Sequence, residues 1–174
     1  MSLTINHQLN DIINSTGTIT INGVAAGGDN TPVWYGSRGL FGGGYTTAEN
    51  NVIDYVTIAT TGNATDFGDL TESKRGVAAC SNGARGLFGG GDDGLVRSNV
   101  IEYVTISTTG NAQDFGDLTV ARLGVASCSD GATGLFGGGS STVRVTTIDY
   151  VTIATTGNAI DFGDLTQDRV YLAA

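Results

Sequence analysis

Four short motifs recur along this 174-residue chain, and their spacing limits its fold more than any other property of the sequence. The first motif, Gly-Leu-Phe-Gly-Gly-Gly, begins at Gly39, Gly86 and Gly134, which are 47 and 48 residues apart. The motifs Ile-Asp/Glu-Tyr-Val-Thr-Ile, Thr-Thr-Gly-Asn-Ala and Asp-Phe-Gly-Asp-Leu-Thr follow in the same order in each copy. A repeat of this length is one supersecondary unit that buries its apolar face only against a neighbouring copy.

Each copy is expected to contain four short antiparallel strands. One first strand covers residues 76–80, and the other three strands come from the motifs with Leu-Phe, Ile-Asp-Tyr and Asp-Phe. The Asn-Gly and Asp-Gly pairs at 82–83 and 130–131 favour a tight hairpin between the first two strands. Four strands in 47 or 48 residues are the period of a propeller blade. We therefore expect an all-β chain of three four-stranded β-propeller blades, at about 31–84, 85–132 and 133–174, after a short N-terminal attachment segment, 1–30.

The blade pattern resembles that of kelch repeats, in which a strand ending in a glycine doublet is followed by a tyrosine and then by another aromatic residue. The matching residues are Phe41-Gly42-Gly43, Tyr55 and Phe67; Phe88-Gly89-Gly90, Tyr103 and Phe115; and Phe136-Gly137-Gly138, Tyr150 and Phe162, with Phe in place of the usual Trp. The near-identical blades resemble more specifically the kelch-like repeats of tailed-bacteriophage virion proteins, especially those of marine cyanophages. Residues 2–23 resemble the start of such phage fibre proteins. The resemblance implies a non-enzymatic virion structural protein, in a fibre, a head decoration or a tail accessory.

Charge and composition exclude several other classes of protein. The chain has 8 Lys+Arg against 17 Asp+Glu and a net charge of -9, so nucleic acid and anionic membrane surfaces are not expected partners. The single histidine, His7, lies in the attachment segment, so no Ser/His/Asp or Cys/His site can form within the blades. We expect no catalytic residue, no cofactor and no metal site. The N-terminus lacks the basic and apolar regions of a signal peptide, which predicts synthesis in a cytoplasm without export by a standard route. The resemblance to phage proteins implies localisation in the virion.

Paired aspartates recur in the fourth strand of each copy, at Asp66/Asp69, Asp114/Asp117 and Asp161/Asp164, and Asp92-Asp93-Gly94 adds an acidic loop. Calcium requires a denser set of oxygen ligands than these spacings supply. We expect the aspartates to cap turns, or to pair with the basic residue five positions after the second aspartate. Those basic residues are Lys74, Arg122 and Arg169. Calcium binding stays open as the alternative.

The two cysteines, Cys80 and Cys128, occupy matching places in two copies. Equivalent positions of adjacent modules rarely meet the geometry of a disulfide. We expect both to be unpaired, small, buried apolar residues.

The loops between the second and third strands, at 45–51, 92–99 and 140–146, are the strongly divergent parts of otherwise copied blades. Loops on a rigid scaffold commonly carry binding specificity. The candidate binding surface consists of Tyr45, Thr46, Asp92, Asp93, Arg97, Ser140 and Arg144. Its expected target is a protein partner, a receptor or a host-surface glycan. The alternative is a soluble carbohydrate-binding propeller lectin with one pocket in each blade.

Three blades do not close a ring, because propellers usually have four to eight. Residues 31–36 are an incomplete first strand, and residues 170–174 are a first strand with no second strand after it. These ends are complementary, which predicts a homo-oligomer that completes the propeller; a segment of a longer propeller is the alternative. The candidate contacts between chains are Trp34, Tyr35, Tyr171 and Leu172. The alternative is that Trp34 and Tyr171 fill the core at the two ends of the array and cap it, as terminal repeats do. The attachment segment, 1–30, is expected to bind other virion proteins; the alternative is a frayed terminus.

Overall fold

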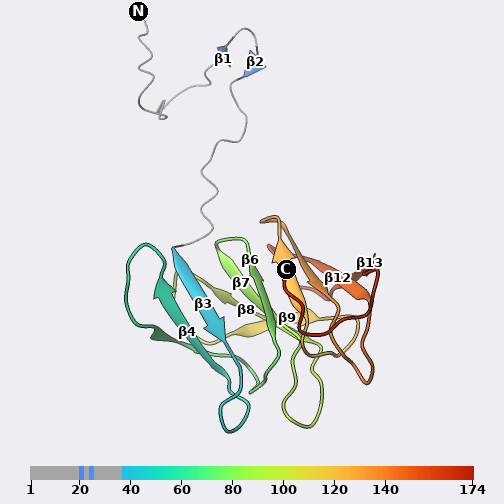
Figure 1. The fold of residues 1–174 in the computed structure, drawn as a ribbon. Helices are drawn as coiled ribbons and strands as arrows, with labels where there is room; N and C mark the ends of the chain where they lie inside the picture. Colours follow the sequence, from blue (N-terminus) through green and yellow to red (C-terminus); the bar gives the residue numbers. More distant parts are fainter. Residues whose placement is uncertain (1–19, 22–23, 26–36) are drawn as a thin grey trace, which may run out of the picture. The chain divides into compact units, whose positions relative to one another are not determined.

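A computed structural model describes residues 20–21, 24–25 and 37–174. These residues form strands and turns only, and they include no helix long and apolar enough to cross a membrane. Residues 37–174 form three antiparallel sheets, drawn from blue-green to red in Figure 1. The expected all-β class is confirmed.

The three sheets follow one another along the chain, and within each sheet every strand pairs with the next one in sequence. Sheet 1 consists of β3 (Arg38–Gly42), β4 (Val52–Thr57) and β5 (Thr65–Asp69). Sheet 2 consists of β6 (Ala78–Ser81), β7 (Arg85–Gly89), β8 (Val100–Thr105) and β9 (Gln113–Asp117). Sheet 3 consists of β10 (Ala126–Ser129), β11 (Thr133–Gly137), β12 (Thr147–Thr152) and β13 (Ile160–Asp164). In the separate unit Met1–Val33, β1 (Thr20–Ile21) pairs with β2 (Val24–Ala25).

Sheets 2 and 3 each have four strands, as the sequence predicts, but their bounds differ from the expected 85–132 and 133–174. The first strands, β6 and β10, lie before those bounds because each forms a hairpin with the strand that follows it. Sheet 1 has three strands among the described residues, and its expected first strand, 31–36, lies outside them. The strand expected at 170–174 is wrong, since these residues form no strand. A strand needs a neighbour for its backbone hydrogen bonds, and no described second strand lies beside this segment.

A β-bulge recurs at the same place in every sheet. Ile53 lies opposite Gly68, whereas the next residue, Asp54, lies opposite Asp66, so Phe67 is the extra residue. The Phe67 ring meets the Tyr55 ring edge-on, with 5.9 Å between the ring centroids. The tyrosine and second aromatic residue of the repeat pattern also contact each other in sheets 2 and 3, at 6.1 and 6.0 Å.

Adjacent sheets pack through two different faces. The leading face of each sheet is the one that carries the Phe of the second strand, the Val of the third strand and the Ala of the Thr-Thr-Gly-Asn-Ala loop. The trailing face carries the Ile of the third strand and the Phe and Leu of the fourth motif. The leading face of sheet 2 packs against the trailing face of sheet 1 through Phe88, Val104 and Ala112 on one side and Ile53, Phe67 and Leu70 on the other. The leading face of sheet 3 packs on sheet 2 in the same way, through Phe136, Val151 and Ala159 against Ile101, Phe115 and Leu118.

Backbone hydrogen bonds extend each interface to the outer edge of the sheets. Gly110 N–H donates to the Phe67 carbonyl at 2.8 Å, and Ala112 N–H donates to the Asp69 carbonyl at 2.8 Å. The loop that contains Gly110 therefore covers the free edge of β5. The loop of the third repeat covers the edge of β9 through Gly157 and Ala159.

A buried ion pair crosses each of the two interfaces. Lys74 Nζ lies 2.5 Å from Glu102 Oε1, and Arg122 Nη2 lies 3.0 Å from Asp149 Oδ2. All four side chains are fully buried. Burial lowers the pKa of the Arg122 guanidinium, and the charge of Asp149 raises it in part. The backbone N–H of Thr119 also donates to Asp149, at 3.1 Å.

The expected pairing of each base with the aspartate five positions before it is wrong. Lys74 binds Glu102 rather than Asp69, and Arg122 binds Asp149 rather than Asp117. The reason is burial: Glu102 and Asp149 are sealed between sheets and need an opposite charge, whereas Asp69 and Asp117 are half-exposed.

We expect the substitution Arg122→Ala to lower the free energy of unfolding by about 3–5 kcal/mol, because it leaves the Asp149 carboxylate buried without a counter-charge. Arg169→Ala is the matched control, since Arg169 occupies the same position in the third repeat but is exposed. We expect Arg169→Ala to change the free energy of unfolding by less than about 0.5 kcal/mol. Urea denaturation of monomeric samples measures both. Equal losses for the two variants would contradict the prediction.

Candidate functional site

The loops between the second and third strands of sheets 1 and 2 lie side by side and form a shared cluster. They extend from the lower edge of the sheets in Figure 1, in cyan and yellow-green. At their junction, Arg75 Nη1 lies 3.3 Å from Glu49 Oε1, and Arg75 Nη2 lies 3.4 Å from Asp92 Oδ1. The Arg75 guanidinium also lies 5.3 Å from the centroid of the Tyr45 ring. We call Tyr45, Glu49, Arg75 and Asp92 the Arg75 cluster.

The divergent loops predicted Tyr45 and Asp92 as binding residues, whereas Glu49 and Arg75 were not predicted. The signal for Arg75 was present, since the equivalent positions hold Leu123 and Val170. Leu123 makes the same backbone pairing with Ser140 that Arg75 makes with Asp92, but it carries no charge. The charged cluster therefore belongs to the junction of the first two loops.

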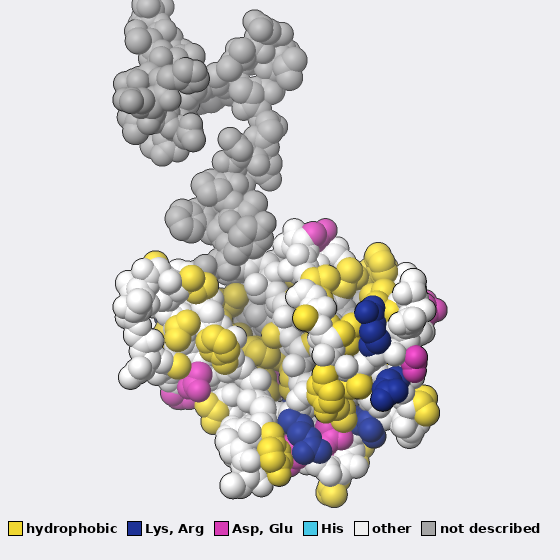
Figure 2. All heavy atoms as spheres, in the orientation of Figure 1, with side chains coloured by type: hydrophobic (Ala, Val, Ile, Leu, Met, Phe, Trp, Pro, Cys, Tyr) yellow, Lys and Arg dark blue, Asp and Glu magenta, His cyan; other side chains and the backbone are white. Residues whose placement is uncertain are grey.

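The remaining predicted residues differ in exposure. Thr46, Asp93 and Arg144 are exposed, and Arg97 and Ser140 are half-buried. The Asp92 side chain is buried, and its carboxylate accepts the backbone N–H of Gly94 at 2.8 Å. Figure 2 shows basic, acidic and apolar side chains interspersed on the visible face rather than a patch of one charge.

Asp93 holds the tip of the second loop. Its Oδ1 accepts the backbone N–H groups of Val96 at 2.6 Å and Leu95 at 2.8 Å, and these bonds lower the pKa of the Asp93 carboxyl. The turn presents Leu95 and Val96 to solvent, 92% and 66% exposed. Asp93 therefore caps a turn, which is one of the two structural roles that the sequence predicts for these aspartates.

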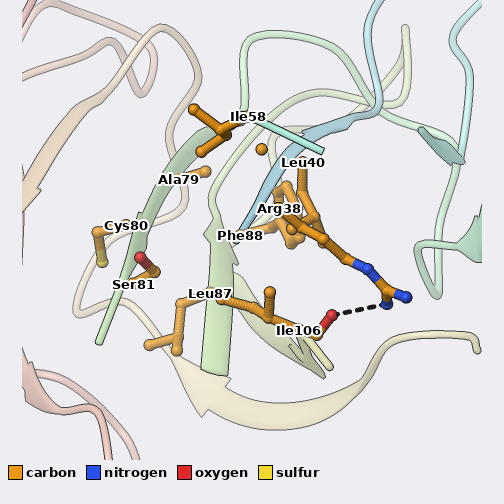
Figure 3. Close-up of a pocket in the computed structure, with 11 residues that line it drawn as sticks. Arg38, Leu40, Ile58, Ala79, Cys80, Ser81, Leu87, Phe88 and Ile106 are labelled. Carbon is orange, nitrogen blue, oxygen red and sulfur yellow. Dashed lines mark hydrogen bonds between the residues drawn. The ribbon is translucent and has the colours of Figure 1, made fainter. Parts of the chain in front are cut away.

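A groove of about 270 Å³ lies between β3 and β6 (Figure 3). Its walls are mostly apolar, with Leu40 and Ile58 on one side and Ala79 and Leu87 on the other. Arg38 crosses the groove margin, where its Nη1 donates to the Ile106 carbonyl at 2.9 Å. In sheets 2 and 3 the first strand, β6 or β10, pairs with the corresponding edge of the second strand. The groove is therefore the place that a first strand of sheet 1 would occupy.

Both cysteines are unpaired, as expected. Cys80 is half-buried in the groove wall, where burial, and to a lesser extent Cys128, raises the pKa of its thiol to about 12. The expected burial of Cys128 is wrong, because this residue is exposed. A third-repeat glycine, Gly134, lies against the Cys80 sulfur, and no described residue takes the corresponding place at Cys128.

The predicted contacts between chains are only partly described. Trp34 and Tyr35 lie outside the described residues. Tyr171 is 73% exposed and has a φ of 57°, at the position where the earlier repeats have Gly76 and Gly124 with φ of 65°. Leu172 is half-buried.

Among the described residues, no three His, Cys, Asp or Glu side chains converge as metal ligands would. No protein-family model matches the sequence, and no curated protein matches it.

We expect acid to loosen the tip of the second loop through Asp93. Because the pKa of Asp93 is lower in the folded chain, its ionised form stabilises the turn fully above the unfolded value of about 3.9. This contribution is lost as the pH falls through the folded pKa. Amide NMR shifts of Leu95 and Val96 against pH measure the transition.

Asp93→Asn is the control, since its amide oxygen still accepts both bonds but does not titrate in this range. The chain itself contains this exchange: Asn82 and Asp130 accept equivalent bonds in the hairpins of sheets 2 and 3. A carboxyl titration of Asp93 at or above about 3.9 would refute the prediction.

Proposed function

We propose that the protein is a non-enzymatic structural component of a bacteriophage particle, in which kelch-like propeller blades present loops to other proteins. The observation that carries the proposal is the contrast between copied sheets and divergent loop tips. The two interfaces between sheets use the same residue types at the same positions. The loop tips instead expose apolar side chains of different kinds, with Leu95, Val96, Val143 and Tyr45 each 59–92% exposed.

Exposed apolar side chains on a fixed scaffold are suited to protein binding. Burying them removes apolar surface from water, and a loop that is already held in place loses little conformational freedom on binding. Asp93 holds the Leu95–Val96 tip, and Arg75 ties the first loop to the second. Both features favour a role of the loops in binding a partner protein over a role as flexible tethers.

The differences among the loops also weigh against a lectin with one equal pocket in each blade. Three equal sugar sites require three similar sets of side chains, whereas Tyr45, Asp92 and Ser140 stand at the same loop position. We propose a single extended surface that meets a virion protein or a receptor, glycosylated or not. Residues 1–30, in this proposal, attach the chain to the particle.

Mass spectrometry of gradient-purified particles of the virus that encodes this chain tests the proposal. We expect peptides from all three repeats in the particle fraction, and immunogold labelling of the particle surface by antibodies against residues 37–174. Lysate depleted of particles is the control. A protein that stays in the soluble fraction and is absent from particles would overturn the proposal.

The loop surface has its own test. The double substitution Leu95→Ser and Val96→Ser removes exposed apolar groups without touching either core, so the melting temperature should stay unchanged. We expect the variant to lose binding to particles that lack the protein. Val52→Ser, at a partly exposed position of β4 outside the Leu95–Val96 tip, should bind like the wild type.

A further inference from the structure

The first and last sheets each leave one packing face open. Phe41 on the leading face of sheet 1 is 63% exposed, whereas its counterparts Phe88 and Phe136 are 2% and 0% exposed. Phe162 on the trailing face of sheet 3 is 59% exposed, whereas its counterpart Phe115 is 2% exposed. The open faces thus carry the same side chains that the two internal interfaces bury.

The charges of the open faces are complementary. Asp54 on the leading face of sheet 1 stands at the position of Glu102 and Asp149, the acids of the two buried ion pairs. Arg169 stands at the position of the bases, Lys74 and Arg122. Within the described residues, Asp54 and Arg169 take part in no ion pair.

The shapes of the open faces are complementary as well. At the internal interfaces a phenylalanine ring lies directly on a glycine of the preceding sheet, so that a Cβ on Gly42 would lie 2.8 Å from Phe88 and one on Gly89 would lie 2.7 Å from Phe136. The equivalent glycine of sheet 3, Gly137, is open, with no atom nearer than Ile148 at 3.7 Å. The surface over Gly137 therefore has room for an aromatic ring such as that of Phe41.

We propose that the leading face of one copy of this chain binds the trailing face of a second copy. Asp54 pairs with Arg169 of the second copy, and Phe41 lies over Gly137 of the second copy. Residues 170–174 of the second copy then reach the groove of Figure 3 and the edge of β3 that pairs with no described strand, just as β6 and β10 follow Lys74 and Arg122 and join the next sheet. The exposed Tyr171 ring belongs to this segment.

The contact is heterologous, so it closes into a ring or grows into a filament. With three repeats per copy, two copies give six sheets, the one multiple of three within the four to eight blades of propellers. The inference therefore specifies a closed dimer. It depends on the faces alone and not on a role in a virus particle, so the two proposals can fail separately.

Sedimentation velocity of the full chain over a wide concentration range tests the association. We expect a species of twice the 17.7 kDa chain mass. A chain that is monomeric at every concentration would overturn the proposal, and a ladder of larger species would overturn ring closure.

A charge exchange tests the predicted pairing. Asp54→Arg and Arg169→Asp each place like charges at both interfaces of a closed dimer, so each variant alone should be monomeric. An equimolar mixture contains one wild-type pair and one exchanged pair, and it should dimerise. Failure of the mixture to dimerise, or dimers of either variant alone, would refute the Asp54–Arg169 contact. The rescue also shows that both variants are folded.

Gly137→Ala tests the predicted contact between Phe41 and Gly137 of the second copy without altering charge. The added methyl group fits the free chain, and we expect it to weaken dimerisation about tenfold or more because it meets the incoming ring. Gly89→Ala is the matched control, because the same clash then falls inside the chain and should lower the melting temperature instead. Unchanged dimerisation of Gly137→Ala would overturn the predicted register.

Discussion

The ion pair buried between adjacent sheets is the interaction on which the rest of the arrangement depends. Lys74 and Glu102, like Arg122 and Asp149, are charged side chains with no access to water, so each is tolerated only opposite its partner. The apolar contacts around them are not directional and would permit a shifted or reversed sheet. The charge pair excludes those arrangements, because any other packing leaves two buried charges uncompensated. The ion pair thus determines that the leading face of one sheet packs on the trailing face of the preceding sheet.

Glycine and phenylalanine supply the second constraint, which is the short distance between adjacent sheets. The rings of Phe88 and Phe136 would lie 2.8 and 2.7 Å from a Cβ on Gly42 and Gly89, so the sheets approach more closely than two ordinary side chains allow. Among the described residues, sheet 1 packs on sheet 2 and sheet 2 packs on sheet 3, so the stability of the array is approximately the sum of its repeats and of these two interfaces. Such an array ends in a leading face on one side and a trailing face on the other. These two end faces are complementary, because every internal interface consists of a leading face packed on a trailing face.

The sequence predicted most strands and their order, because the signals are local: hairpin dipeptides at 82–83 and 130–131 and a strand-like motif in every copy. It predicted the partner of Lys74 wrongly, since a base and an acid 28 residues apart meet through the packing of two sheets. It also missed Glu49 and Arg75, which join Tyr45 and Asp92 because two loops from different repeats converge on the Arg75 side chain. Exposure of Cys128 follows from its place beside an open face, which the repeat pattern alone does not reveal.

One departure from the repeat bears on how strong the contact between copies is. Arg38 and Arg85 each donate to a backbone carbonyl of the following sheet and lie over a tyrosine ring of their own sheet, at 4.5 and 4.7 Å. The third copy has Thr133 at this position, which is too short to reach across. A hydrogen bond to a charged group contributes about 1.5–3 kcal/mol, so the contact between copies lacks one stabilising interaction that both internal interfaces have. The same chemistry that holds the three sheets together therefore gives a weaker joint between chains, one that can open while the sheets of each chain stay packed.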